Sequence, residues 1–252
     1  LILGRFNHKK SNNMKIEVKP PSSISLIIGC LFSLLSLGCQ LTAAPNIVMV
    51  YTDDQGLSDV GAYGFVDDIR TPHIDSLAKR GVRFLNAYVT SPVCGPSRLG
   101  LMSGQYQQRF NVFDNEDLPF VYEGVPVAER LRQVGYRTGM VGKLHLPRQN
   151  LGGQSPAHWG FDEFFMDHGY FTMAPNRRLV THHPDGTVTP KGKWVEVEGY
   201  RTDLHTDEAI RFIERNKDEP FFLYLAYCAP HTPLEATGKY LSRFPDVTPE
   251  AR

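Results

Sequence analysis

Two continuous apolar runs, at residues 46–51 and 221–227, dominate the hydrophobic pattern of the chain. Runs without an alternating polar face are typical of strands buried on both sides of a sheet. Shorter strands are expected at 82–89 and 136–141. Apolar spacing and glycine stops predict helices at 71–81, 94–104, 125–134 and from 202 onward. Strands and helices therefore alternate, which predicts an α/β sandwich with a mostly parallel central sheet.

Charge and length narrow the classes of function only a little. The 252 residues include 27 basic and 27 acidic side chains, so the formal net charge is zero. A balanced chain lacks the basic footprint of a nucleic-acid-binding protein, and we expect no nucleic-acid partner. The length fits one domain or two.

Residues 1–44 are interpreted as upstream sequence followed by a secretory signal peptide. A basic segment after Met14, an apolar run at 24–37 and small residues at 42–44 give the expected order of such a signal. A retained anchor helix, or lipid attachment at Cys39, is the alternative. In each case we expect a secreted or periplasmic protein, which meets a membrane only if the leader is retained or lipidated.

The mature part of the chain would contain two cysteines, Cys94 and Cys228. An exported protein can join two such residues in a disulfide. Cys228 ends an apolar strand, however, and is expected to be a buried free thiol. This reading leaves Cys94 available for chemistry.

Two adjacent carboxylates, Asp53 and Asp54, directly follow the first buried strand. Functional sites of open α/β sheets gather at the carboxyl ends of strands. Carboxylate oxygens are the ligands that hard cations prefer. An isolated Asp-Asp pair also suits a capped turn, but its place after a buried strand favours a metal site.

Cys94 begins the short helix predicted at 94–104. Pro96 suits the first turn of that helix, and Gly104 suits its end. Because the first N–H groups of a helix have no intrahelical partner, Cys94 would face the positive end of the helix dipole. Arg98 lies one turn on, so its guanidinium can fold back toward the same point. The pattern predicts a nucleophile in an anion-attracting pocket.

Three basic side chains follow the later strands. Lys143 and His145 alternate along a predicted extended segment, so they would project to one side. His231 lies between two prolines after the apolar run at 221–227. A cation and titratable rings at these positions suit a bound oxyanion and proton transfer.

The segment Cys94-Gly95-Pro96-Ser97-Arg98 resembles the signature of the formylglycine-dependent sulfatases, within the alkaline-phosphatase superfamily. The resemblance implies that a formylglycine-generating enzyme oxidises Cys94 to an aldehyde. One oxygen of its hydrate would attack the sulfur of a sulfate ester, and the second would expel sulfate by rebuilding the aldehyde. Arg98 would stabilise this diol.

The resemblance continues in chain order through Asp53–Asp54, Lys143/His145 and His231. It implies that Lys143 and His231 contact the sulfate, that His145 orients the diol, and that His231 can protonate the leaving alcohol. Asp53, Asp54 and the modified Cys94 would bind Ca²⁺, with Mg²⁺ as the alternative. A sulfated saccharide or small aryl sulfate is the expected substrate.

The chain departs from the family pattern after His231, where sulfatases supply a further acid–amide pair, another lysine and a C-terminal domain. We therefore interpret 45–252 as the incomplete N-terminal part of a sulfatase catalytic domain, and expect this piece alone to be weakly active or inactive. Two alternatives stay open: a phosphonate or phosphodiester hydrolase of the same superfamily, and an inactive exported binding protein.

Several polar residues are expected to be structural. His73 lies near a helix start, Asp114-Asn115 is interpreted as a surface turn, and His182-His183 as a solvated turn between short strands. The stretch 158–183 is expected to be rich in loops that shape the substrate site, with 159–165 packed near the sheet.

Overall fold

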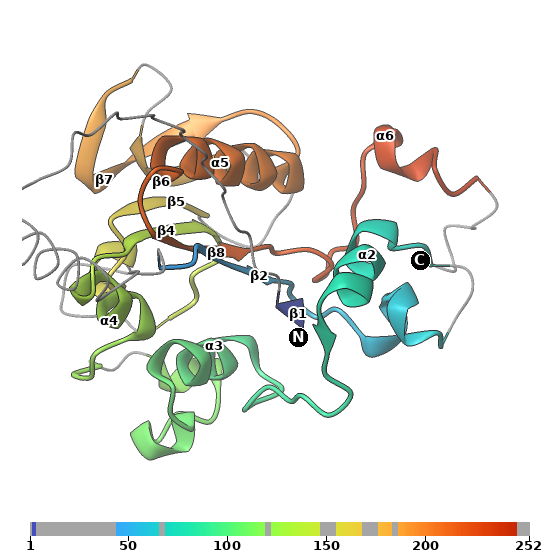
Figure 1. Ribbon diagram of the computed structural model, residues 1–252, viewed down its shortest axis with the longest axis horizontal. Helices are drawn as coiled ribbons and strands as arrows, with labels where there is room; N and C mark the ends of the chain where they lie inside the picture. The colour runs from blue at the N-terminus through green and yellow to red at the C-terminus, as the bar shows by residue number, and fades with distance from the viewer. Residues whose placement is uncertain are drawn as a thin grey trace, which may run out of the picture. The chain divides into compact units, whose positions relative to one another are not determined.

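The structure, a computed structural model, describes residues 2–3, 44–65, 69–118, 122–146, 155–167, 176–182 and 186–245. Six strands form one sheet in the spatial order β2-β8-β4-β5-β6-β7 (Figure 1). Their bounds are β2 (Ile47–Tyr51), β4 (Arg137–Gly142), β5 (Glu163–Asp167), β6 (Asn176–His182), β7 (Val188–Val197) and β8 (Phe221–Ala226). The first four strands in spatial order run parallel, and β6 and β7 continue the sheet antiparallel. The mostly parallel sheet is confirmed.

The helices agree closely with the hydrophobic pattern. The α-helices are α2 (Pro72–Arg80), α3 (Cys94–Ser103), α4 (Val127–Gln133), α5 (Arg201–Asn216) and α6 (Gly238–Leu241). Short 3₁₀ turns are η1 (Leu57–Asp59), η2 (Gly61–Tyr63), η3 (Gln107–Phe110), η4 (Asn115–Asp117) and η5 (Pro156–Trp159). All four predicted helices are present, and α6 is the additional one.

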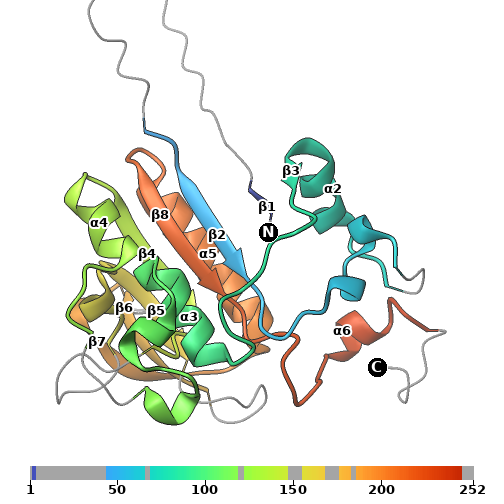
Figure 2. The same ribbon diagram turned by 90° about the horizontal axis from the view of Figure 1, so that it is seen from below.

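The adjacent strands β8 and β4 bury both of their faces. Phe222 and Tyr224 of β8 lie with Met140 of β4 in one apolar cluster, which also includes residues of α3 and α4. Leu223 of β8 and Val141 of β4 belong to a second cluster, covered by α5. Figures 1 and 2 show α5 on one side of these strands and α3 with α4 on the other. Because both faces are covered, the run at 221–227 has no polar alternation.

The packing of α5 on the sheet depends on Phe212, which is 1% exposed. A Cβ atom added at Gly139 of β4 would lie 2.3 Å from the Phe212 ring, so the ring rests on bare strand backbone. We expect Phe212→Ala to lower the free energy of unfolding by about 3–5 kcal/mol, because a cavity replaces the ring. Urea unfolding measures this effect, and Ile210→Ala is the control, since Ile210 on the same helix is 53% exposed. Equal losses in the two variants would contradict the packing described.

The strand predicted at 82–89 is wrong beyond Arg83. Only β3 (Val82–Arg83) is a strand, and it pairs antiparallel with β1 (Ile2–Leu3). Ile2 and Leu3, which we interpreted as upstream sequence, therefore form a strand that the sequence did not predict. Several apolar side chains after β3 are exposed: Phe84, Leu85, Tyr88 and Val89. Apolar and polar residues alternate there as in a strand, but in the described part of the chain no neighbouring strand pairs with the residues beyond Arg83.

The stretch 158–183 is more regular than expected. It contains β5 and β6, and the strands on either side of residues 183–185 are long rather than short. The expected packing of 159–165 near the sheet is confirmed, because Trp159 and Phe161 are buried in the core. Glu163, at the start of β5, is 3% exposed and accepts hydrogen bonds from Arg137 and Arg215. This buried ion cluster explains how a strand with a charged first residue can lie inside the sheet.

Candidate active site

Cys94 is the first residue of α3, as the sequence predicts. Val93 before it is extended, and its N–H donates to Ser91 Oγ at 3.1 Å. Gly104 ends the helix in the left-handed conformation, with φ of 67°. Eight of the ten residues of α3 are buried, whereas Cys94 is half-buried. The helix therefore presents one accessible sulfur at its N-terminus.

A cavity of about 690 Å³ lies beside this sulfur. Its wall includes Asp53 and Asp54 from the end of β2, Cys94 and Arg98 from α3, and the segment 87–93 between β3 and α3. The cavity thus brings together side chains that the sequence separates by about forty positions. Their meeting at the carboxyl end of β2 follows the rule for parallel sheets.

Asp53 connects the two cations of the site. Lys143 Nζ donates to Asp53 Oδ2 at 2.5 Å, and Arg98 Nη2 lies 3.4 Å from Asp53 Oδ1. All three side chains are nearly excluded from solvent, with exposures of 4% for Asp53, 6% for Lys143 and 0% for Arg98. One carboxylate faces two cations, so this buried cluster carries formal positive charge and favours an anion in the adjoining cavity.

Arg98 is fixed by strand ends rather than by Cys94. Its Nη1 donates to the Lys143 carbonyl at 2.8 Å and to the Tyr224 hydroxyl at 3.0 Å. The guanidinium also lies over the Tyr51 ring, 5.1 Å from the centroid. These contacts join α3 to β2, β4 and β8. The two tyrosines were not predicted as site residues, because a tyrosine inside an apolar run gives no separate signal.

Two left-handed backbone positions, at Gly142 and at His145 itself, place the side chains of Lys143 and His145 at the site. Gly142 has φ of 103°, and a Cβ there would lie 2.0 Å from the Ala226 carbonyl oxygen. This close approach lets Lys143 N–H donate to the same oxygen at 2.8 Å. His145 is also left-handed, with φ of 45°, and its Nδ1 lies 3.2 Å from Cys94 Sγ. The two side chains therefore share the site, although the segment is not the regular extended chain we expected.

The environment of His145 disfavours its protonated form. Burial, and then the charges of Lys143 and Arg98, lower the pKa of His145 from 6.5 to about 4. The imidazole is therefore neutral at pH 7 and can accept a proton from the group at residue 94.

This shift predicts a pH dependence of stability. Between about pH 6.5 and pH 4 the unfolded chain binds a proton that the folded His145 does not, so the free energy of unfolding should fall as the pH is lowered through that window. His145→Gln should remove this part of the loss. Urea unfolding at pH 7 and pH 4.5 measures the difference, and an unchanged loss in the variant would contradict the buried neutral imidazole.

His231 and Asp54 face each other at the more exposed side of the site. His231 Nε2 lies 3.5 Å from Asp54 Oδ2, and the Asp54 side chain is 56% exposed. His231 also contributes to lowering the pKa of His145, which places the two rings within electrostatic reach. The structure therefore gathers all seven predicted residues at one end of the sheet, listed here in chain order: Asp53, Asp54, Cys94, Arg98, Lys143, His145 and His231.

Cys228 is separate from this chemistry. Cys94 and Cys228 are both free, which confirms the predicted unpaired thiol. Cys228 Sγ donates to Asp167 Oδ2 at 3.2 Å, and burial together with that carboxylate raises the pKa of Cys228 to about 12. Asp167 also contacts Arg178, Arg201 and His205 in a buried ionic cluster that the sequence did not predict.

The residues set aside as structural differ in their outcomes. His73 is exposed on α2, and the His182 ring lies 3.3 Å from Glu163 rather than in a solvated turn. His183 lies outside the described residues. Asn115 was interpreted as part of a surface turn, but its amide contacts Cys94 and Gly95. Its neighbour Asp114 is exposed and fits that interpretation.

A divalent cation fits this donor set in part. Asp53 and Asp54 supply carboxylate oxygens at the cavity, which suits a hard cation, although Asp53 Oδ2 already accepts from Lys143. Within the described ranges no three acidic, histidine or cysteine side chains are grouped closely enough to hold a metal ion. Six to eight oxygens are typical of Ca²⁺, so Asp53 and Asp54 could form only part of such a site.

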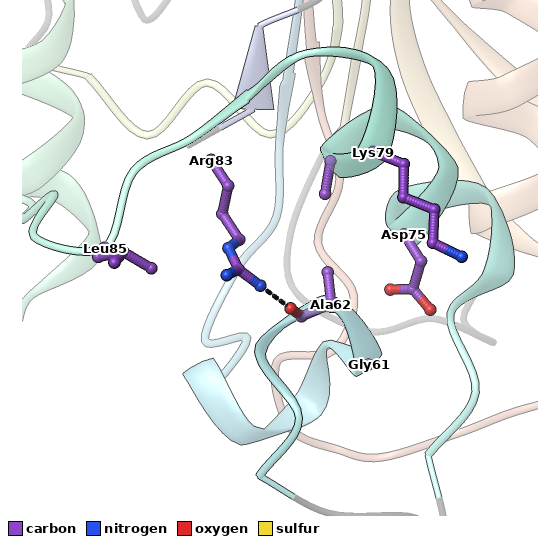
Figure 3. A pocket seen from close by; sticks show the side chains of 7 residues that line it. Gly61, Ala62, Asp75, Lys79, Arg83 and Leu85 are labelled. Carbon is purple, nitrogen blue, oxygen red and sulfur yellow. Dashed lines mark hydrogen bonds between the residues drawn. The ribbon is translucent and has the colours of Figure 1, made fainter.

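A second cavity, of about 620 Å³, lies beside α2 and η2 (Figure 3). Arg83 donates across it to the Ala62 carbonyl, while Asp75 and Lys79 line the opposite wall. Asp75 Oδ1 accepts a hydrogen bond from the Thr71 hydroxyl at 2.8 Å. This cavity contains none of the predicted catalytic residues.

Of the helices in the described part of the chain, none is long and apolar enough to cross a membrane.

Comparison with known proteins agrees with this geometry. The sequence model of the sulfatase family matches residues 45–252. An arylsulfatase of Hemicentrotus pulcherrimus is 35% identical over an alignment of 218 positions including gaps, which covers 78% of this chain and 39% of that protein. An N-acetylgalactosamine-6-O-sulfatase of Bacteroides thetaiotaomicron is 30% identical over an alignment of 270 positions including gaps, which covers 83% of this chain and 53% of the relative. The chain spans about half, or less, of the length of these relatives.

Solved structures share the same arrangement of sheet and helices. BT4656, in complex with its substrate D-glucosamine-2-N,6-O-disulfate, gives a TM-score of 0.66 at 29% identity, over 81% of this chain and 38% of that chain. A phosphonate monoester hydrolase of Agrobacterium radiobacter, at 21% identity and a TM-score of 0.56, covers 78% of this chain and 43% of that chain, and is similar in fold alone.

The sheet order and the cluster at its carboxyl edge define an α/β protein of the alkaline-phosphatase-like fold. The family match then covers the chain from residue 45 to its last residue. This chain belongs to the sulfatase family.

Proposed function

We propose that the protein hydrolyses sulfate esters, with residue 94 as the attacking group. The observation that supports this most directly is the position of Cys94 at the N-terminus of α3, with His145 Nδ1 3.2 Å from its sulfur. The positively charged cluster of Lys143, Arg98 and Asp53 adjoins the same cavity and would favour a sulfate group there.

The chemistry requires Cys94 to be oxidised to formylglycine by a formylglycine-generating enzyme during maturation. Hydrated formylglycine supplies two hydroxyls on one carbon, one to attack sulfur and one to release sulfate afterwards. His145, neutral at pH 7, accepts the proton of the attacking hydroxyl. Lys143 balances charge on the sulfate oxygens, and His231 protonates the alcohol as its bond to sulfur breaks.

We propose Ca²⁺, with Mg²⁺ as the alternative, as the metal of the complete site. Asp53 and Asp54 would hold it, together with the modified residue 94 and ligands outside the described residues. A bound divalent ion would supply charge neutralisation at the sulfate. Chelation should therefore abolish turnover, and added Ca²⁺ should restore it.

The substrate class is proposed from the relatives. The curated relatives named above are an arylsulfatase and an N-acetylgalactosamine-6-O-sulfatase, and one structural neighbour was solved with a disulfated glucosamine. We therefore propose a sulfated saccharide as the natural substrate and an aryl sulfate as a practical one.

The test compares substrates on the protein expressed from its whole reading frame together with a formylglycine-generating enzyme. We expect 4-nitrophenyl sulfate to be hydrolysed faster than an aryl phosphodiester or an aryl phosphonate, in the presence of Ca²⁺. Faster phosphodiester or phosphonate turnover would overturn the sulfatase assignment. Absence of turnover on all three, with Cys94 unmodified, would favour a non-catalytic exported protein.

We also propose that the protein is secreted or periplasmic. The support is the leader pattern at 1–44, which lies almost wholly outside the described residues. Sequencing the N-terminus of the exported protein should find Pro45 first. A chain that begins at Cys39 would instead show a lipoprotein, and a chain retained in the cytoplasm would contradict export.

A further inference from the structure

The side-chain amide of Asn115 contacts both Cys94 and the residue after it. Its Oδ1 accepts the Gly95 N–H at 3.1 Å, and its Nδ2 donates to Cys94 Sγ at 3.7 Å. His145 Nδ1 approaches the same sulfur at 3.2 Å. The reactive atom of residue 94 therefore has an imidazole and an amide as neighbours.

The orientation of this amide is determined by its partner. A backbone N–H can donate only to the oxygen of the side chain, so Oδ1 must face Gly95 and the NH₂ group is left to face Cys94. Asn115 is also neutral at every pH at which the protein folds. It therefore offers residue 94 a donor whose charge does not change.

The turn that carries Asn115 is fixed by its own hydrogen bonds. Asn115 N–H donates to Asp114 Oδ1 at 2.5 Å, and Asp117 Oδ2 accepts from the N–H groups of Phe113 and Asp114 at 2.8 Å and 3.0 Å. Leu118, one residue further on, is buried at 6% exposure. The amide is thus held on a short rigid element rather than on a free loop.

Gly95 is what allows this turn to lie on the start of α3. A Cβ atom at Gly95 would lie 2.4 Å from Leu118 Cδ1 and 2.6 Å from Asn115 Oδ1, closer than real Cβ atoms come to such neighbours. A larger residue between Cys94 and Pro96 would push the amide away from the sulfur. Gly95 is therefore needed for the Asn115 amide to reach Cys94.

We propose that Asn115 positions the nucleophile: its Nδ2 donates to the reactive atom of residue 94, the sulfur before modification and one hydroxyl of the hydrate afterwards. The second half of this statement rests on the proposed sulfatase function. With one hydroxyl held by Asn115, the other is directed to His145 and the cavity. Arg98 donates to the Lys143 carbonyl and the Tyr224 hydroxyl and lies near Asp53, so the contacts to the sulfur described here come from Asn115 and His145.

Asn115→Asp separates this role from a purely structural one. Aspartate keeps the oxygen that accepts the Gly95 N–H, and it stabilises a helix N-terminus as well as asparagine does. It cannot donate to residue 94, and it brings a negative charge beside the reactive atom. A cap whose side chain lies away from residue 94 therefore predicts normal activity for Asn115→Asp, whereas an amide that contacts and donates to the reactive atom predicts a loss.

The first measurement is turnover of 4-nitrophenyl sulfate by the converted protein, with thermal unfolding in parallel. For Asn115→Asp we expect kcat to fall about a hundredfold, as when one preorganised donor is removed, with KM within about threefold and an unchanged melting temperature. Asn115→Ala should lose both activity and stability. Glu116→Ala, an exposed neighbour on the same turn, is the matched control and should behave as wild type. Wild-type kcat in Asn115→Asp would overturn the proposal.

The second measurement does not depend on sulfatase chemistry. In protein made without the formylglycine-generating enzyme, the rate at which iodoacetamide alkylates Cys94 is followed on the tryptic peptide 84–98. We expect Asn115→Asp to slow alkylation about threefold or more at pH 7.5, because a carboxylate opposes the thiolate. An unchanged rate would overturn the contact even if no sulfate ester is ever hydrolysed, and a slowed rate in a protein without turnover would retain the contact while rejecting the sulfatase proposal.

Discussion

Cys94→Ala should reduce the turnover of an aryl sulfate by about 10⁴-fold or more, because it removes the attacking atom of the proposed reaction. The fold should not change, since Cys94 is half-buried and its sulfur contacts the polar side chains of His145 and Asn115 rather than the apolar core. Both proteins are expressed together with the formylglycine-generating enzyme, turnover is measured with Ca²⁺ present, and far-ultraviolet circular dichroism checks the fold.

Cys94→Ser tests the same step from another side. A serine alkoxide can attack sulfur once, but it has no second hydroxyl with which to expel sulfate, so the variant should stop as a sulfate ester on the peptide 84–98. Cys228→Ala is the control for loss of a thiol, because the Cys228 sulfur donates to Asp167 and alanine keeps the backbone carbonyl that accepts the His231 N–H, so its turnover should stay within about threefold of wild type. Full turnover in Cys94→Ala would show that another residue attacks.

Asp53→Asn should cost both stability and activity. The change keeps the shape of the side chain but removes the negative charge that contacts Lys143 and Arg98, leaving two buried cations uncompensated. Removing one partner of a buried ion pair typically costs about 3–5 kcal/mol of folding free energy. Turnover should fall by about 10³-fold or more, because a carboxylate proposed for the metal is lost and Lys143 loses its anchor.

Asp54→Asn separates the two effects. Its side chain is 56% exposed and its ion-pair partner at the site is His231, so the loss of stability should stay within about 0.5 kcal/mol. Turnover should still fall, because the second proposed metal ligand is gone. Urea unfolding and aryl sulfate turnover on both variants provide the comparison, and equal stability of the two proteins would contradict the buried cluster around Asp53.

The sequence predicts the parallel core of this fold because burial on two faces leaves a direct mark. The run at 221–227 has no polar alternation, and it forms β8, which is buried between β2 and β4. The equally apolar run at 46–51 forms the edge strand β2 instead, where Val50 is 52% exposed, so burial on both faces was wrongly expected there. The antiparallel strands β6 and β7 have a mixed composition and were expected to be shorter than they are. The run at 82–89 shows the opposite error, since strand propensity there meets no described partner strand beyond residue 83.

The site residues were predictable where a residue type and a strand end coincide. Asp53, Lys143 and His231 each follow a strand that the apolar pattern reveals, and the structure brings them to one edge of the sheet. Asn115 follows no such strand, and an acid–amide pair in a loop is typical of many turns. Its approach to Cys94 depends on the close packing at Gly95 and on the conformation of η4, and the sequence pattern indicates neither.

The direction of Arg98 was also beyond the sequence. Helical spacing predicts that the Arg98 side chain can reach back toward Cys94, but spacing does not show whether other contacts of the side chain are more favourable. The guanidinium finds a carboxylate, a carbonyl and a hydroxyl at the ends of three strands. Competing partners that come from distant parts of the chain decide the orientation of a long side chain.

The mass of the tryptic peptide 84–98, from protein purified from its native host, shows whether Cys94 has become the attacking group. We expect a peptide that has lost hydrogen sulfide and gained one oxygen at residue 94, and that reacts with a hydrazide as an aldehyde does. A peptide that carries an intact thiol, or one linked to Cys228, would leave the proposed hydrolysis without its attacking oxygen and would rule it out.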